Sequence, residues 1–157
     1  MRPIEVGYTW RRLAAKCANL IGVEKTSALV APNQVGVGTP GGAKAAIHAT
    51  RRFVQQLPTG NVLIKLDLSN AFNTLRRGTM LKAVAEYIPE IYAFVYANYH
   101  DISQPQFGEY IIESGEGPQQ GDPLSALLFC IATICFSNCF AQTYVQAIWM
   151  MFHWAVH

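Results

Sequence analysis

Two polar segments, separated by about fifty residues, hold the side chains that could do chemistry in this chain. The first follows an apolar run at residues 62–66, which predicts a buried strand and leads to a single carboxylate, Asp67. The end of such a strand is a common place for a ligand-binding cleft. Asp67 is therefore a candidate metal ligand, although it could instead cap the turn or helix that begins near Ser69.

The second polar segment, residues 116–124, reads Glu-Gly-Pro-Gln-Gln-Gly-Asp-Pro-Leu. Its last acidic residue, Asp122, precedes Pro123 and a long apolar run. Proline fits the first turn of a helix, and an acidic side chain there favours the helix dipole. The pattern therefore predicts a buried helix at residues 124–140, with Asp122 as a helix-start residue and not a metal ligand.

Together and in this order, the two segments resemble the first and second palm motifs of reverse transcriptases from non-LTR (LINE-like) retrotransposons. The first motif corresponds to residues 65–73, Lys-Leu-Asp-Leu-Ser-Asn-Ala-Phe-Asn. The likeness also covers residues 2–4, Arg-Pro-Ile, and the glycine-rich residues 36–42, so that it runs from the first residues to about Ala132. The resemblance implies RNA-directed DNA polymerase activity, which is metal-dependent nucleotidyl transfer.

The resemblance also implies an α/β (α+β) fold, with a small antiparallel sheet packed against helices. Residues 1–140 would form a partial reverse transcriptase domain. Within it, residues 1–60 would belong to the fingers and residues 61–140 to the palm. Residues 141–157 resemble no palm segment and form an apolar tail of unclear origin.

By resemblance, Asp67 is a catalytic residue that binds Mg²⁺, and the backbone carbonyl of Leu68 helps to coordinate the metal near the nucleotide. Hard cations such as Mg²⁺ take oxygen ligands, and polymerases use two of them held by carboxylates. The implied partners are an RNA template, a DNA primer and a deoxynucleoside triphosphate.

Four further residues match nucleotide-binding positions of the family. Arg2 would contact the triphosphate, for which a permanently charged guanidinium is suited. Phe72 would stack under the sugar and exclude a 2′-hydroxyl by its bulk. Gln120 and Gly121 would lie over the incoming nucleotide, where the amide can hydrogen-bond the sugar and glycine allows close approach of the backbone.

One part of the family pattern is missing. The family supplies its remaining metal ligands from an aromatic-x-Asp-Asp turn, but this sequence contains no Asp-Asp pair and no carboxylate side chain after Asp122. A single aspartate cannot bring two divalent cations together, because their mutual repulsion needs more countercharge. We therefore expect a truncated fragment that is inactive by itself.

Composition leaves two alternatives to the polymerase. The chain has 157 residues, 51% of them hydrophobic, and a net charge of only +2, so it suits one folded domain with weak, salt-sensitive affinity for nucleic acid. It could thus be a non-catalytic relic or a weak nucleic-acid-binding module. Residues 123–157 carry no formal charge, which would suit membrane association, but repeated polar residues make this third hypothesis less favoured.

The sequence opens with no apolar signal segment, which predicts an intracellular and not a secreted protein. The spacing of the four cysteines fits neither a zinc site nor a disulfide framework. We therefore expect them to be reduced core residues: Cys17, Cys130, Cys135 and Cys139.

Hydrophobic spacing predicts a helix at residues 10–21, capped by Thr9, in which Arg11 and its basic neighbours face solvent. Its buried stripe would consist of four residues: Leu13, Cys17, Leu20 and Ile21. A second helix is predicted at residues 43–57, after the glycine-rich loop. Arg51 and Arg52 of this helix would contact a template backbone or simply face solvent, and its packing face would consist of Ala46, Ile47, Thr50 and Val54.

Three shorter elements are expected between the two motifs. Thr79 can cap a helix that ends at Tyr87, and Pro89 can start another that runs to about Tyr99. Alternation at residues 107–113 predicts a strand that is interrupted by a turn at Gly108-Glu109.

Overall fold

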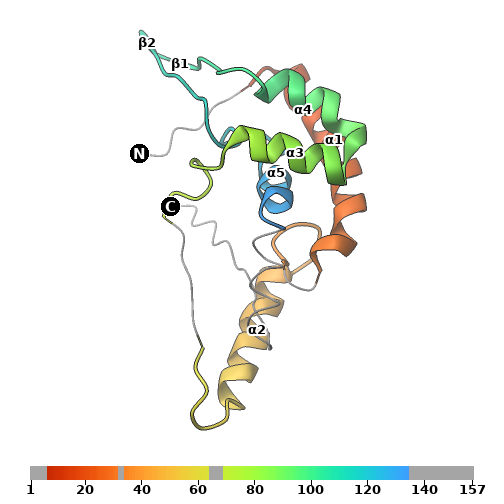
Figure 1. The fold of residues 1–157 in the computed structure, drawn as a ribbon, viewed down its shortest axis with the longest axis vertical. Coiled ribbons are helices and arrows are strands. Elements are labelled where there is room, and N and C mark those ends of the chain that lie inside the picture. The colour runs from red at the N-terminus through yellow and green to blue at the C-terminus, as the bar shows by residue number, and fades with distance from the viewer. Residues whose placement is uncertain (1–6, 32–33, 64–68, 135–157) are drawn as a thin grey trace.

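Most of the described chain is helical, and one short hairpin forms its only sheet (Figure 1). The computed structural model describes residues 7–31, 34–63 and 69–134. The helices within these ranges are α1 (Thr9–Val30), α2 (Gly42–Gln55), α3 (Arg77–Tyr87), the 3₁₀ helix η1 (Pro89–Ile91), α4 (Tyr92–Tyr99) and α5 (Ser125–Ala132). The strands are β1 (Gln106–Phe107) and β2 (Tyr110–Ile111), which pair antiparallel. The expected combination of helices with a small antiparallel sheet is therefore present, with helix by far the larger part.

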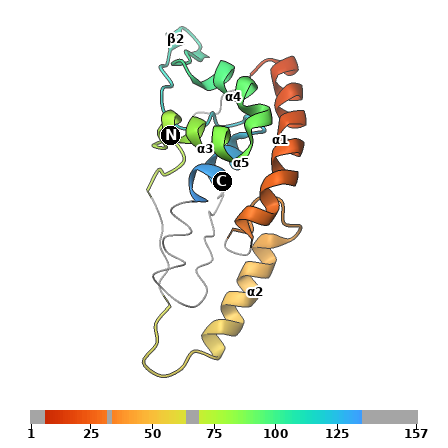
Figure 2. The same ribbon diagram turned by 45° about the vertical axis from the view of Figure 1, so that its right-hand side comes forward.

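Helix α5 lies at the centre of the hydrophobic core, with α3 on one side and α1 on another (Figures 1 and 2). Its side chains Leu127 and Leu128 are fully buried. Helix α3 contributes Met80 and Val84, which are likewise inaccessible to solvent. Burial of such aliphatic side chains is the main favourable term in folding, so this core holds α1, α3, α4 and α5 together.

Helix α1 packs against α5 through its small residues and not through the predicted stripe. The buried side of α1 consists of Ala15, Ala18, Gly22, Thr26 and Val30. The predicted stripe is wrong, because Leu20 is 72% exposed and Leu13 is 51% exposed. The reason is the close approach of α5: a Cβ atom added to Gly22 would lie 2.3 Å from Cδ2 of Leu127. Larger side chains do not fit between the two helices.

The glycine-rich loop fixes the start of α2. Gln34 anchors this loop to the core, since its Nε2 donates to Sγ of Cys130 at 2.9 Å and its Oε1 accepts from the amide of Val37 at 3.3 Å. At the start of α2, a Cβ atom on Gly42 would lie 1.9 Å from the carbonyl oxygen of Val35, so glycine is required there. Helix α2 then extends away from the core (Figures 1 and 2).

The predicted packing face of α2 is only partly correct. Ala46 is buried and Thr50 is half-buried, as expected. Ile47 and Val54 are instead 42% and 48% exposed. The helix is 14 residues long and lies beside the core only near its start, so most of its apolar side has no described helix to pack against.

The elements between the two motifs follow the local sequence signals closely. Pro89 begins η1, which continues directly into α4, and the β-hairpin turns at Gly108-Glu109. Gly108 has φ +60°, a left-handed conformation that favours glycine. Helix α3 begins at Arg77, two residues before the predicted cap at Thr79, and the threonine is an ordinary residue of its first turn.

Helix α5 covers the first part of the predicted helix at residues 124–140, and residues 135–140 of that prediction lie outside the described residues. It ends at Ala132, and the hydroxyl of Thr133 donates to the carbonyl oxygens of Phe129 and Cys130 at 2.9 and 3.0 Å. This side chain bonds back to carbonyls of the last turn, an arrangement that favours a local bend in a helix. None of the helices in the described part of the chain has both the length and the apolarity needed to cross a membrane.

The two described cysteines have opposite environments. Cys130 is buried in α5, and burial raises the pKa of its thiol to about 11, while the hydrogen bond from Gln34 works in the other direction. Its thiol therefore stays protonated and unreactive at neutral pH, as expected for a core cysteine. Cys17 is exposed on α1, so its prediction as a core residue is wrong.

Several predicted features lie outside the described residues. These include most of the strand at residues 62–66, the candidate ligands Asp67 and Leu68, and Arg2. Cys135, Cys139 and the tail at residues 141–157 also lie outside. The two described residues of the predicted strand, Val62 and Leu63, are exposed and have no regular secondary structure.

Because α5 lies so close to Gly22, substitutions at Gly22 and at Gly78 should change the free energy of unfolding in opposite directions. Gly22→Val should lower the free energy of unfolding by about 1–3 kcal/mol, because the added atoms overlap the fully buried Leu127. Gly78→Ala should raise it by about 0.4–1 kcal/mol, because nothing lies within 4 Å of the added Cβ atom. Urea unfolding followed by circular dichroism would measure both, and equal effects would contradict this packing.

Candidate functional site

The described end of the first motif, residues 69–73, forms a tight turn. Asn70 adopts a left-handed conformation with φ +52°, which asparagine tolerates better than most residues. Its carbonyl oxygen accepts from the amide of Asn73 at 3.0 Å, and its side chain accepts from Nδ2 of Asn73 at 2.7 Å. The turn thereby fixes the backbone on both sides of Phe72.

The loop of the second motif lies directly on this turn. The amide of Gly117 donates to the carbonyl oxygen of Leu75 at 2.7 Å, and Nε2 of Gln120 donates to Oδ1 of Asn73 at 2.9 Å. Gly117 has φ +66°, and a Cβ atom there would lie 2.5 Å from the carbonyl oxygen of Phe72. Only glycine allows this approach, which brings two segments more than forty residues apart in the sequence into contact.

Three of the predicted nucleotide-binding residues therefore lie in one region. The half-buried ring of Phe72 packs against Phe129 of α5, with centroids 5.4 Å apart and an angle of 35° between the planes. Gln120 is half-buried, and Gly121 is exposed with φ +99°. Phe72 offers an aromatic ring, Gln120 a side-chain amide and Gly121 an exposed backbone. These groups suit the binding of an uncharged polar group such as a sugar.

Asp122 is a structural residue at the centre of a buried network. Its Oδ2 accepts from Nη2 of Arg11 at 3.0 Å and from the hydroxyl of Tyr99 at 2.9 Å. Its Oδ1 accepts from the amide of Leu124 at 2.9 Å, immediately before α5. The prediction of a helix-start residue is confirmed, whereas the prediction that Arg11 faces solvent is wrong, because the Arg11 side chain turns inward to this carboxylate.

Tyr99 lies between two guanidinium groups in the same network. Its ring centroid is 5.9 Å from Cζ of Arg11 and 5.4 Å from Cζ of Arg77. Its hydroxyl also accepts from the backbone amide of Gln119 at 3.3 Å. Burial, followed by the neighbouring charge of Asp122 and the hydrogen bond to it, raises the pKa of Tyr99 far above its usual value. The phenol therefore remains a hydrogen-bond donor at every physiological pH.

Arg77 is a buried cation that sequence reasoning did not identify. Its Nη1 donates to the carbonyl oxygen of Asp101 at 2.8 Å, its Nε to that of Gly117 at 3.2 Å, and its Nη2 to Oγ of Ser114 at 3.1 Å. Only 7% of the residue is exposed. These contacts join the start of α3 to both ends of residues 101–117, the segment that leads from α4 to the second motif. No local signal in the Arg76-Arg77 pair distinguishes this buried arginine from its exposed neighbour.

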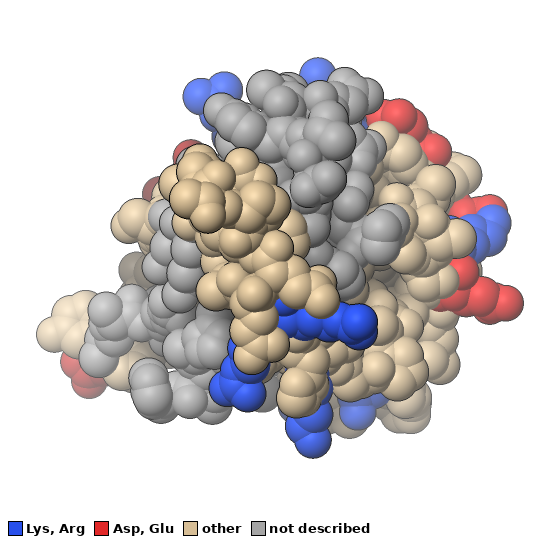
Figure 3. Space-filling model, turned by 90° about the horizontal axis from the view of Figure 1, so that it is seen from below, with Lys and Arg blue, Asp and Glu red and all other residues tan. Residues whose placement is uncertain are grey.

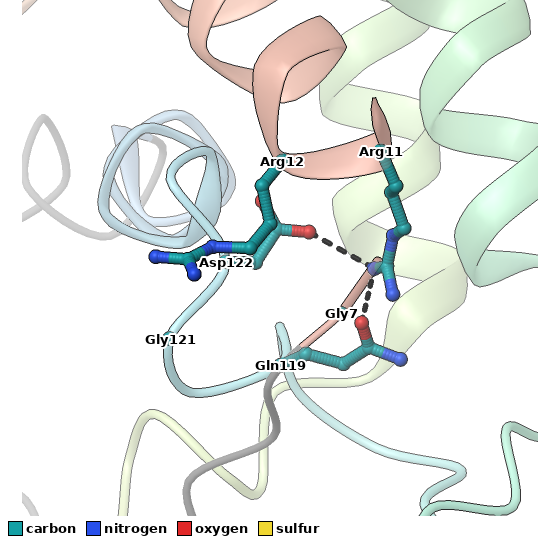
Figure 4. A pocket seen from close by; sticks show the side chains of 6 residues that line it. All are labelled: Gly7, Arg11, Arg12, Gln119, Gly121 and Asp122. Carbon is teal, nitrogen blue, oxygen red and sulfur yellow. Dashed lines mark hydrogen bonds and ion pairs between the residues drawn. The ribbon is translucent and has the colours of Figure 1, made fainter. Parts of the chain in front are cut away.

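A small hollow adjoins the network (Figure 4). Its lining consists of Gly7, Arg11, Arg12, Gln119, Gly121 and Asp122, and its volume is about 10 Å³. Figure 4 shows the Arg11 side chain reaching Asp122 and Gln119, while that of Arg12 extends in another direction past Asp122. A space of this size takes about one water molecule, so the hollow is not itself a nucleotide pocket.

The described residues do not fit a magnesium site. Within residues 7–31, 34–63 and 69–134, no group of three His, Cys, Asp or Glu side chains is placed to hold a metal ion. Asp122, the carboxylate of the second motif, is only 6% exposed and has both oxygens engaged. Asp67 remains the predicted ligand, but it lies outside the described residues.

Comparisons with protein-family models, with curated proteins and with solved structures each found no match to this chain. The function proposed below therefore depends on the sequence motifs and on the geometry of the described residues.

The network around Asp122 predicts a large difference between two aspartate substitutions. Asp122→Ala should lower the free energy of unfolding by about 3 kcal/mol, because it leaves the Arg11 guanidinium and the Tyr99 hydroxyl without their acceptor. Asp101→Ala is the matched control, because its side chain is 81% exposed, and it should cost less than about 0.5 kcal/mol. Chemical denaturation measures both, and similar losses would show that the Asp122 network is not important for stability.

Proposed function

We propose that this chain carries part of the nucleotide-binding site of a reverse transcriptase of the non-LTR retrotransposon type. The observation that supports this most is the contact between the two motif segments, through the hydrogen bonds from Gln120 to Asn73 and from Gly117 to Leu75. In a polymerase both segments have to border the same incoming nucleotide. Contact between them is what that function requires of the fold.

Each predicted site residue has a chemical role in this proposal. The ring of Phe72, held against Phe129, would occupy the space beside C2′ of the sugar and so exclude a ribonucleotide. The amide of Gln120 would hydrogen-bond the sugar, and the exposed backbone of Gly121 would allow the nucleotide to approach closely. Arg2 would bind the triphosphate, and Asp67 with the carbonyl of Leu68 would bind one Mg²⁺.

We further propose that the chain does not polymerise by itself. Asp122 is held by Arg11 and Tyr99, so it does not replace the carboxylates of the absent aromatic-x-Asp-Asp motif. The chain would thus bind a deoxynucleotide without transferring it. Its place of action would be inside the cell, where template and deoxynucleotides are found.

The alternative of a weak nucleic-acid-binding module has its own support in α2. This helix contains no acidic residue, and its side chains Lys44, Arg51 and Arg52 are all exposed. Seen from the end of the molecule to which α2 extends, several Lys and Arg side chains gather on one side, while Asp and Glu lie mainly at the edges (Figure 3). Exposed cations on a projecting helix suit a phosphate backbone without any sequence preference.

Nucleotide binding is tested with dTTP and 5-methyl-UTP, which differ only at C2′ of the sugar, in the presence of Mg²⁺. We expect dTTP to bind more tightly than 5-methyl-UTP, and Gln120→Ala to weaken dTTP binding by about five- to tenfold, the effect of losing one hydrogen bond. Phe72→Val should narrow the difference between the two nucleotides. Gln55→Ala, an exposed glutamine on α2, is the control and should change nothing.

Primer extension on an RNA template, with a melting curve for each variant, completes this test. We expect no extension from the folded chain. Extension that is lost in Asp67→Ala would contradict the proposed inactivity. Equal binding of dTTP by the original chain and by folded Gln120→Ala would contradict the proposed nucleotide site itself.

The alternative predicts a separate effect on RNA binding. Arg51→Ala/Arg52→Ala should weaken binding of single-stranded RNA and reduce the slope of log K against log salt by about 1.4, or about 0.7 for each lost phosphate contact. Arg76→Ala/Lys82→Ala removes two exposed charges elsewhere and should leave the slope unchanged. Equal effects of the two double variants would indicate general charge attraction and no site on α2. Fluorescence anisotropy over a salt series measures both.

A further inference from the structure

Helix α1 has a second apolar side, which faces solvent. This outer face of α1 consists of Trp10, Leu13, Cys17, Leu20 and Ile21. Trp10 is 81% exposed and Leu20 is 72% exposed, whereas the small residues on the opposite side pack into the core. Figure 2 shows α1 along the outer edge of the molecule.

The spacing of the outer face is that of a helix-pairing seam. Trp10, Leu13, Cys17 and Leu20 follow one another at intervals of three, four and three residues. This is the heptad pattern by which one helix packs along another. Isolated exposed apolar residues are common, but a continuous row on one helix indicates a contact surface.

We propose that the outer face of α1 binds the outer face of a second copy of this chain, with the two helices antiparallel. When the two-fold axis crosses the outer face at the level of residue 15, Trp10 faces Leu20 of the second copy and Leu13 faces Cys17, since each pair of numbers sums to 30. All four seam residues are then covered, and each layer combines a larger side chain with a smaller one. Two identical faces that match in this way form a closed dimer and not a filament.

The charges at the two ends of α1 favour this orientation. The first turn of α1 contains no acidic residue, and its N-cap, Tyr8, makes no side-chain capping hydrogen bond. In the antiparallel dimer, this register places Glu24 of one copy just before the start of α1 at Thr9 in the other. A carboxylate there interacts favourably with the positive end of the helix dipole. A parallel pair would instead place like ends together.

One helix pair is a small interface, so we expect a dimer with a dissociation constant in the micromolar range. Sedimentation velocity over a range of concentrations measures it. Leu13→Glu/Leu20→Glu should give a monomer with an unchanged melting temperature, since both side chains are exposed. Phe107→Glu/Ile111→Glu is the matched control, because these hairpin residues are 67% and 68% exposed and lie outside the proposed interface.

Glu24→Gln tests the proposed orientation and should weaken the dimer by about two- to fivefold. Cross-linking tests the register. The two Cys17 residues should lie about 6 Å apart along the helix axis and on facing sides, within reach of a short bis-maleimide. In a chain with Cys135→Ser and Cys139→Ser, this reagent should give a covalent dimer, because Cys130 is buried. Glu86→Cys/Cys17→Ser, with an exposed cysteine on α3, should not.

Three outcomes would overturn the inference. The original chain could stay monomeric at all concentrations, which would mean that another protein, a membrane or another segment of this chain covers the face. The dimer could persist in Leu13→Glu/Leu20→Glu. It could also dissociate in the hairpin variant alone, which would place the interface there. None of these results depends on nucleotide binding, so the dimer and the nucleotide site are tested independently.

Discussion

The arrangement of the helices depends on the hydrogen bonds and the ion pair of one buried carboxylate, that of Asp122. It accepts hydrogen bonds from Arg11 of α1, from Tyr99 of α4 and from the amide of Leu124 at the start of α5. A carboxylate is costly to remove from water, and the cost is offset only when its partners are held in good geometry. The three helices therefore have little freedom to shift relative to one another.

The candidate site depends on this network through the loop of the second motif. Asp122 fixes the end of that loop, and Arg77 fixes its beginning by donating to the carbonyl oxygen of Gly117. Gln120 and Gly121 lie between these two fixed points, so their positions are set by contacts within the protein. The same arrangement excludes Asp122 from metal chemistry, because a carboxylate that is paired with a guanidinium is already satisfied.

Local rules predicted the features that depend on a few neighbouring residues. Pro89 at a helix start, the turn at Gly108-Glu109 and the helix-start role of Asp122 all follow from backbone geometry and capping. The buried side of α1 did not follow, because it is decided by how closely α5 approaches Gly22, a distance set by the whole core. The role of Arg77 was missed for a similar reason, since its partners lie 24 to 40 residues away.

The long span of the central ion pair has a consequence for how the chain folds. Arg11 and Asp122 are 111 residues apart in the sequence. Helices α1 and α5, which pack against each other, likewise lie near opposite ends of the described sequence. Contacts between distant residues slow folding, because the loop must close before they form. During synthesis, α1 would leave the ribosome long before α5 exists, with neither of its apolar sides covered. A chaperone that holds nascent chains would then find an accessible apolar target in α1.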